Sequence, residues 1–240
     1  MYAKLGRSFP LLDARSRLFR QRHMEIRGRL CIIEYMSNIH RDLELLCLNA
    51  KKYGASGAAY MSSRGVVVDP RVRLKCMVPV CSSYGVSLMC PPNVMSVEEF
   101  RRVVNKFSHV VLVQYPIPLD EAFMASEFGG KPLAEIRDKG EYLKRIAESE
   151  RAFMDLLCRI EKDAQGLGYR FATALSGGQC RLCDECVGQA SGEACRHPFR
   201  ARPAMEAVGI DVILTAKNAG LPIEFPAKDK PVWTGLLLVD

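Results

Sequence analysis

Seven of the ten cysteines fall into two short clusters, and this pattern constrains the chain more than any other feature. The chain has 240 residues, of which 48% are hydrophobic, so it can build a core without covalent cross-links. It contains no apolar stretch of about 18 residues, as a membrane span requires, and no signal-peptide pattern. We therefore predict a cytoplasmic protein without a membrane segment. In such a protein, clustered thiols indicate metal binding or catalysis rather than disulfides.

The second cluster is the more specific one, with the spacing C-x2-C-x2-C-x8-C. Its members are Cys180, Cys183, Cys186 and Cys195. Bacterial ferredoxins hold [4Fe–4S] clusters with the same C-x2-C-x2-C run, although their fourth cysteine follows at a shorter gap. Zinc sites more often use two separated C-x2-C pairs, or cysteines paired with histidines. The spacing therefore favours an iron–sulfur cluster, with zinc as the alternative.

The first cluster has three cysteines, Cys76, Cys81 and Cys90, in a loop rich in proline, serine and glycine. A cubane held by three thiolates leaves one iron open to a substrate, which is the arrangement that metal catalysis requires. Cys195 could instead complete this site and leave three ligands in the second cluster. The spacing thus predicts one or two [4Fe–4S] clusters on seven cysteines and leaves their division open.

The remaining cysteines are predicted to be structural, because buried free cysteine behaves as a small hydrophobe. They are Cys31, Cys47 and Cys158. Burying a negatively charged cluster requires compensation, which nearby basic side chains can supply. The candidates near the second cluster are Arg181, Arg196, His197, Arg200 and Arg202. A solvated basic face is the alternative interpretation of these arginines.

Positive charge is concentrated near the N-terminus. Residues 1–35 contain eight basic and three acidic residues and so carry +5 of the net charge of +7. The nearly neutral remainder gives no reason to predict a nucleic-acid or membrane partner. We interpret residues 1–35 as a basic extension and residues 36–240 as the metal-binding domain. The extension is either flexible or the product of an upstream start codon, and a transit peptide is a weaker alternative for it.

Alternating helix and strand patterns predict a single compact α/β domain with a mixed sheet, flanking helices and two cysteine-rich metal-binding loops. Helices are expected over 39–50 before Gly54, after the capping box of Ser96 and Glu99, and over 134–165 with a break at Gly140. A further helical stretch is expected from Pro203, restarting at Asp211 and ending at Gly220. Strands are expected over 65–69, 110–115, 169–175 and 232–239.

Several exact stretches resemble an uncharacterised prokaryotic family described as predicted metal-binding proteins. They are Val67–Asp69, Arg73–Cys76, Cys90–Pro92, Cys180–Cys186, Cys195–Pro198, Arg202–Ala207 and Gly209–Val212. The resemblance extends over residues 37–240 and leaves residues 1–35 outside it. It implies metal binding on the matched cysteines and an anaerobic prokaryotic host, and it implies no particular reaction.

Three functions compete on these observations. The first is an iron–sulfur protein that transfers electrons or carries clusters and docks on a redox or enzyme partner. The second is an enzyme that uses the three-cysteine cluster to bind a substrate or to perform sulfur chemistry, with Arg196 and His197 near the substrate. The third is an interaction module that zinc holds folded.

Overall fold

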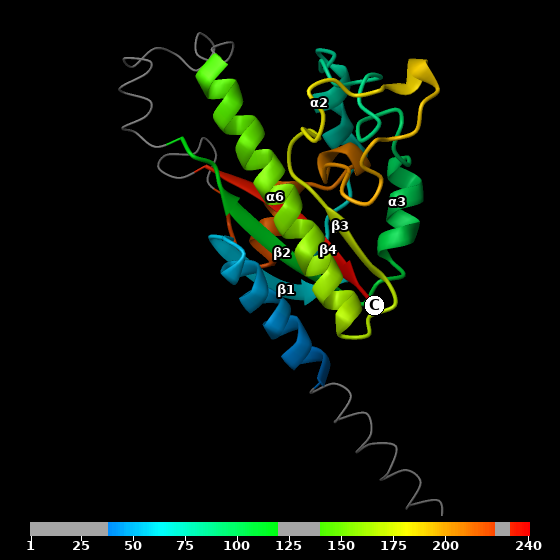
Figure 1. The fold of residues 1–240 in the computed structure, drawn as a ribbon. Helices are drawn as coiled ribbons and strands as arrows, with labels where there is room; N and C mark the ends of the chain where they lie inside the picture. The colour runs from blue at the N-terminus through cyan, green and yellow to red at the C-terminus, as the bar shows by residue number, and fades with distance from the viewer. Residues whose placement is uncertain (1–37, 120–139, 224–230) are drawn as a thin grey trace, which may run out of the picture. The chain divides into compact units, whose positions relative to one another are not determined.

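The computed structural model describes residues 38–119, 140–223 and 231–240 (Figure 1). The chain divides into two compact units, residues 1–41 and 42–240. Of the first unit, only residues 38–41 are described, and they are helical. The second unit carries both cysteine clusters. None of the helices in the described ranges has the length and apolar character needed to cross a membrane.

The second unit is built on a four-stranded sheet with the order β1-β2-β4-β3. The strands are β1 (Gly57–Ser62), β2 (His109–Pro116), β3 (Ala172–Leu175) and β4 (Val232–Val239). All three pairings are antiparallel, so the α/β class is confirmed but the predicted mixed sheet is wrong. The reason lies in the connections. Strand β1 ends at Ser62, β2 begins at His109, and these two residues pair, so the long segment between them returns to the same end of the sheet and β2 runs antiparallel to β1.

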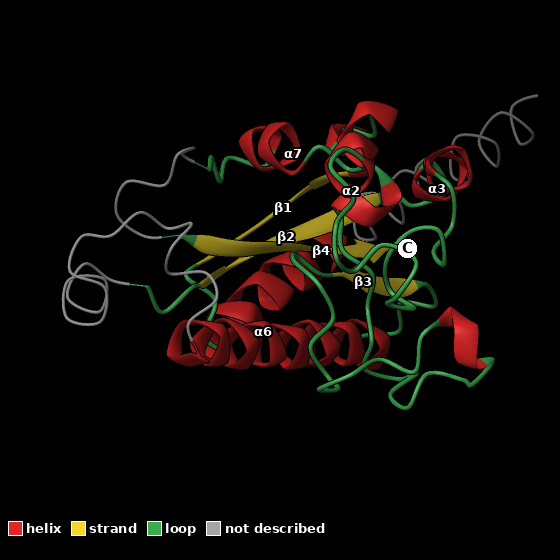
Figure 2. Ribbon diagram, turned by 90° about the horizontal axis from the view of Figure 1, so that it is seen from above, coloured by secondary structure: helices red, strands yellow, loops and turns green. Residues whose placement is uncertain are grey.

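The two central strands form the middle of the core. Val110, Val111, Leu112 and Val113 of β2 are fully buried, because helices cover both faces of the sheet. Figure 2 shows α6 (Gly140–Gly166) on one face, and α2 (Leu74–Met77), α3 (Val97–Val104) and α7 (Val212–Asn218) on the other. A strand buried on both faces reads as a continuous apolar run, which is why its position was visible in the sequence.

The helices follow their local signals. Residues 42–52 are helical, and the chain turns at Gly54, whose φ of +106° suits glycine. Helix α3 begins with the predicted capping box, in which the Ser96 hydroxyl accepts from the Glu99 N–H at 3.2 Å and the Glu99 carboxylate accepts from the Ser96 N–H at 2.8 Å. Asp211 caps α7 by accepting from the Leu214 N–H at 3.0 Å. Residues 134–139 of the long predicted helix lie outside the described residues.

In the described part of the chain, four short 3-10 helices join these elements: η1 (Ser63–Gly65), η2 (Pro70–Arg73), η3 (Gln189–Ser191) and η4 (Glu206–Val208). The strand predicted over 65–69 is wrong, since Val68 forms only an isolated bridge with Ile210. The Asp69 carboxylate accepts from the Arg71 N–H at 2.8 Å and so starts η2 instead of extending a strand. The helix predicted from Pro203 is limited to η4 before α7 begins.

Candidate metal centre

The two cysteine-rich segments lie against each other at one end of the sheet (Figure 1). Side chains of Ser83 and Gln179 form a hydrogen bond between them. Gly188, with a φ of +70°, approaches the other loop so closely that an added Cβ would stand 3.1 Å from the Val86 carbonyl oxygen. The fold therefore brings together two clusters that are far apart in the sequence.

The second cluster surrounds a single cavity. All four of its members line that cavity: Cys180, Cys183, Cys186 and Cys195. The first loop closes one side with Ser87, Leu88 and Met89, and no carboxylate of the described residues lines the cavity. Soft thiolate donors without carboxylates select zinc, copper(I) or iron–sulfur clusters, so the donor set fits the metals that the spacing predicts.

The first cluster forms a separate but adjoining group. Cys76 lies in α2, and the Cys81 N–H donates to the Cys76 carbonyl at 3.0 Å. The loop then closes through Gly85, whose N–H donates to the Pro91 carbonyl at 2.8 Å. Burial, with a smaller contribution from charges on Cys81, Cys76 and Cys180, raises the pKa of the Cys90 thiol to about 11. Cys180 therefore lies near both clusters.

Several donors are directed at cysteine sulfurs. The His197 N–H donates to the Cys195 sulfur at 3.4 Å. A Ser87 hydrogen bond lowers the pKa of Cys90, and a Leu182 N–H bond lowers that of Cys180, although burial dominates and raises both. Hydrogen bonds to sulfur stabilise thiolates and tune metal centres that they bind.

Within the described ranges, no group of three or more His, Cys, Asp or Glu side chains is arranged to hold one metal ion. A tetrahedral zinc ion with Zn–S bonds of about 2.3 Å would draw its sulfurs to about 3.8 Å from one another. A cubane sets its thiolates farther apart, since each thiolate binds a different iron.

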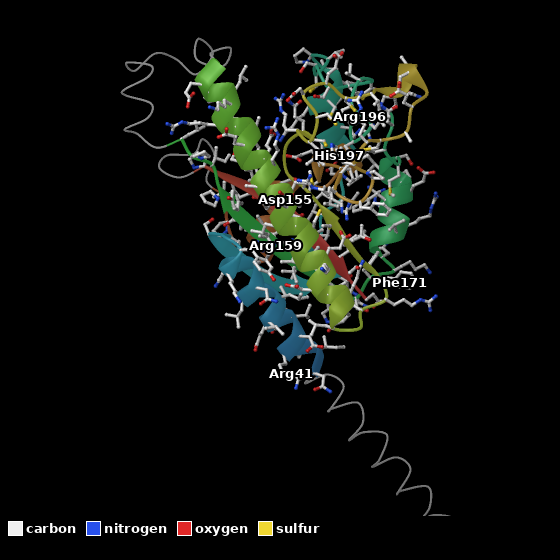
Figure 3. The ribbon with its side chains drawn as sticks, viewed as in Figure 1. Arg41, Asp155, Arg159, Phe171, Arg196 and His197 are labelled. Atoms are coloured by element: carbon white, nitrogen blue, oxygen red, sulfur yellow. The ribbon has the colours of Figure 1, made fainter. Side chains whose placement is uncertain are left out.

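The basic residues near the second cluster differ in where their side chains point. Arg200 pairs with Asp155 at 2.6 Å and Arg202 with Glu161 at 2.5 Å, and both carboxylates belong to α6. Arg196 donates to the Glu185 carbonyl at 3.0 Å and, with His197, lines the cysteine cavity (Figure 3). Of the predicted neighbours, Arg196 and His197 thus adjoin the thiols, whereas Arg200 and Arg202 tie the loop to α6.

Two residues of α6 were not predicted to belong to this site. The buried Glu150 carboxylate accepts from the Arg181 Nε at 3.1 Å and the Gln179 N–H at 3.3 Å. Arg151 donates from its Nε to the Arg181 carbonyl at 2.6 Å. Glu150 lies one turn before the buried Phe153 and therefore on the apolar face of the helix. An acidic residue on that face is the feature of the sequence that could have indicated its role.

Burial raises the pKa of Glu150 to about 7, although Arg181 opposes this shift. The direction is informative, since an ion pair alone would lower the pKa of a carboxyl group. The free-energy cost of removing this carboxylate from water therefore exceeds the stabilisation that the carboxylate gains from the partly exposed Arg181.

The other described cysteines lie apart from the cavity. Cys47 is buried, and burial raises its pKa to about 11. Cys158 lies in α6, and its thiol donates to the Arg200 carbonyl at 3.5 Å. Cys31 lies outside the described residues.

Comparisons with known proteins agree with metal binding. Residues 59–239 match the model of a family described as "Predicted metal-binding protein (DUF2284)". No curated protein and no solved structure matches the chain. The matched range runs from within β1 to the end of β4 and includes both cysteine clusters, so the chain belongs to this family of predicted metal-binding proteins.

Proposed function

We propose that the chain is an iron–sulfur protein whose Cys180, Cys183, Cys186 and Cys195 hold a [4Fe–4S] cluster. The observation that carries this proposal is that these four thiols share one cavity. Their C-x2-C-x2-C spacing is the one that ferredoxins use for such clusters. When bound, a cluster of this kind supplies a one-electron couple, so we assign the protein to electron transfer or to cluster delivery.

The surroundings of the cavity support a redox centre over a purely structural one. The His197 N–H is directed at the Cys195 sulfur, and Arg196 lines the same space. Donors and positive charge beside thiolates offset the negative charge of a bound cluster and raise its reduction potential. Leu88 and Met89 add apolar side chains to the lining on the side of the first loop.

A protein partner follows from this role, because electrons and clusters are passed on by contact. Apolar side chains beside the cysteines are available for it: Phe199 is 88% exposed and Val78 is 72% exposed. We propose that a redox protein or an enzyme docks at this end of the unit, in the cytoplasm.

A second candidate function is catalysis at the first cluster. Its Cys76, Cys81 and Cys90 supply three thiols. Burial raises the pKa of the Cys76 thiol, and the nearby Glu206 carboxylate adds a smaller contribution in the same direction. A three-cysteine cubane with an open iron beside an acidic side chain would be suited to binding a substrate.

The test is a set of cysteine variants purified without oxygen. Cys183→Ser and Cys186→Ser should each lose about four iron per chain and the visible absorption and reduced-state electron paramagnetic resonance signal of that cluster. Cys158→Ser is the matched control and should retain all three. Retention of full iron by Cys183→Ser and Cys186→Ser would contradict the assignment of this site.

A further inference from the structure

A cleft separate from the cysteine cavity is lined by four short segments and by Ile223. The segments are residues 69–75, residues 177–178 just after β3, residues 206–213, and residues 232–234 at the start of β4. Backbone hydrogen bonds of 2.8 Å hold these walls together, from Asp69 N–H to Gly209 and from Met205 N–H to Ser176. The cleft has a volume of about 680 Å³, which is ample for a small molecule.

Two polar atoms in the lining have no partner. The Glu206 Oε2 and the Thr234 hydroxyl are both buried without a hydrogen bond in the described part of the chain. A buried polar atom without a partner costs about 1–3 kcal/mol, so groups of this kind are rare unless something else binds them. Burial also raises the pKa of Glu206, with Lys75 opposing the shift.

The rest of the lining separates into a charged rim and an apolar wall. Arg71 at the rim is already engaged by Asp69, whose carboxylate accepts from its Nε at 2.9 Å. Lys75 is exposed, lines the same cleft, and makes no ion pair among the described residues. Ile213, Ile223 and Trp233 supply the apolar surface.

We propose that this cleft binds a small amino carboxylate with an apolar side chain, such as an aliphatic α-amino acid. The ligand ammonium would donate to Glu206 Oε2 and to the Thr234 oxygen, its carboxylate would pair with Lys75, and its side chain would lie against Trp233. Among the described residues, the Glu206 Oε2 has no hydrogen-bond partner and Lys75 has no acid, and one zwitterion satisfies both. The proposal does not depend on the metal that the cysteines bind.

Trp233 is the only tryptophan in the chain and lines the cleft, so it reports binding directly. The full-length protein, purified without oxygen, is titrated with L-leucine, with 3-methylbutylamine and with 4-methylpentanoate, and tryptophan emission and heat are recorded. L-leucine should bind saturably, and each analogue, which lacks one charged group, should bind at least tenfold more weakly. Equal binding of all three would overturn the proposal, since it would show an apolar pocket without charge recognition.

Two near-isosteric variants test the named groups. Glu206→Gln and Thr234→Val should each weaken L-leucine binding at least tenfold, whereas Glu148→Gln, on the exposed face of α6, should leave it unchanged. Metal content equal to that of the wild type shows that each variant is folded. Unchanged affinity in both cleft variants would overturn the proposal, as would the absence of saturable binding by L-leucine and every other protein amino acid.

The same titration on Cys183→Ser separates this proposal from the proposed function. That variant should lose iron and still bind L-leucine with wild-type affinity. Loss of L-leucine binding in Cys183→Ser with a normal fold would contradict a cleft that is independent of the cysteines.

Discussion

At the scale of single residues, the turn from β3 into the second cysteine cluster depends on the absence of a side chain at Gly177. A Cβ there would stand 2.6 Å from the Thr234 carbonyl oxygen and 3.2 Å from the Thr234 nitrogen. Both atoms belong to the backbone of β4, which the paired sheet holds in place. The glycine is therefore required for packing, because no rotamer change can relieve the clash.

We expect Gly177→Ala to destabilise the folded unit by about 1–3 kcal/mol, as overpacking in a close-packed core does. Thermal unfolding should show a midpoint lowered by several degrees. Gly166→Ala is the control, because a Cβ at Gly166 meets no atom within 4 Å, and its midpoint should be unchanged or slightly raised. Equal midpoints for Gly177→Ala and the wild type would contradict this close approach of Gly177 to β4.

Glu150 gives the stability a dependence on pH. Its pKa rises from the ordinary 4.5 to about 7 in the folded chain, so the folded state binds more protons than the unfolded state between these values. The resulting contribution to stability is complete below the unfolded pKa and is lost as the pH rises through about 7. The shift corresponds to a contribution of about 2–3 kcal/mol that disappears between about pH 5 and about pH 8.

Glu150→Gln removes this contribution and keeps the shape of the side chain. The free energy of unfolding of the wild type, relative to that of Glu150→Gln, should therefore fall by about 2–3 kcal/mol on going from about pH 5 to about pH 8. Denaturant unfolding at several pH values measures the difference, with Glu148→Gln as the control that should show no such trend. A difference that rises with pH would mean that Arg181 stabilises the carboxylate more than burial penalises it.

At the scale of secondary-structure elements, α6 is both a wall of the core and the support of the second cysteine loop. It buries Phe153, Leu157 and Ile160 beneath the sheet and presents its charged residues to the loop. Arg151 contributes one of these links, with its Nε 2.6 Å from the Arg181 carbonyl oxygen. The cysteine loop is thus held by a rigid helix rather than by its own backbone alone.

Arg151→Met should loosen this loop while preserving the side chain's packing stem. We expect this variant to lose its metal to a chelator several-fold faster than the wild type does. The decay of the visible absorption measures this rate. Arg145→Met is a suitable control, because Arg145 pairs with Glu141 within the same helix, at 3.3 Å. Identical rates in the two variants would show that Arg151 does not hold the loop.

The elements that the sequence predicted correctly have strong local signals. The capping box of α3 and the apolar runs of β2 and β4 depend on neighbouring residues only. Strand β1 was missed, because its Gly57, Ala58 and Ala59 carry too little apolar character to show an alternating pattern. The stretch at 65–69 looked like a strand, but its Val68 pairs with one distant residue, Ile210, and not with a full neighbouring strand.

At the scale of the whole molecule, the seven cysteine ligands stay a prediction, and the sequence could not predict which of these cysteines lie together in the fold. The spacing left Cys195 free to join either cluster, and the fold places it in the cavity with Cys180, Cys183 and Cys186. Pairing of the two loops depends on contacts such as Ser83 with Gln179, which are separated by nearly a hundred residues. The support from Glu150 and Arg151 escaped prediction for the same reason, because it arises only when α6 packs beside the loop.

The most direct test of the central claim is the content of iron, zinc and acid-labile sulfide per chain in protein purified without oxygen. A [4Fe–4S] cluster on the second group predicts about four iron and about four sulfide, rising to about eight of each if the first group also holds a cubane. One or two zinc per chain without sulfide would contradict the claim, since the cysteines would then serve to hold the fold together and not to carry electrons.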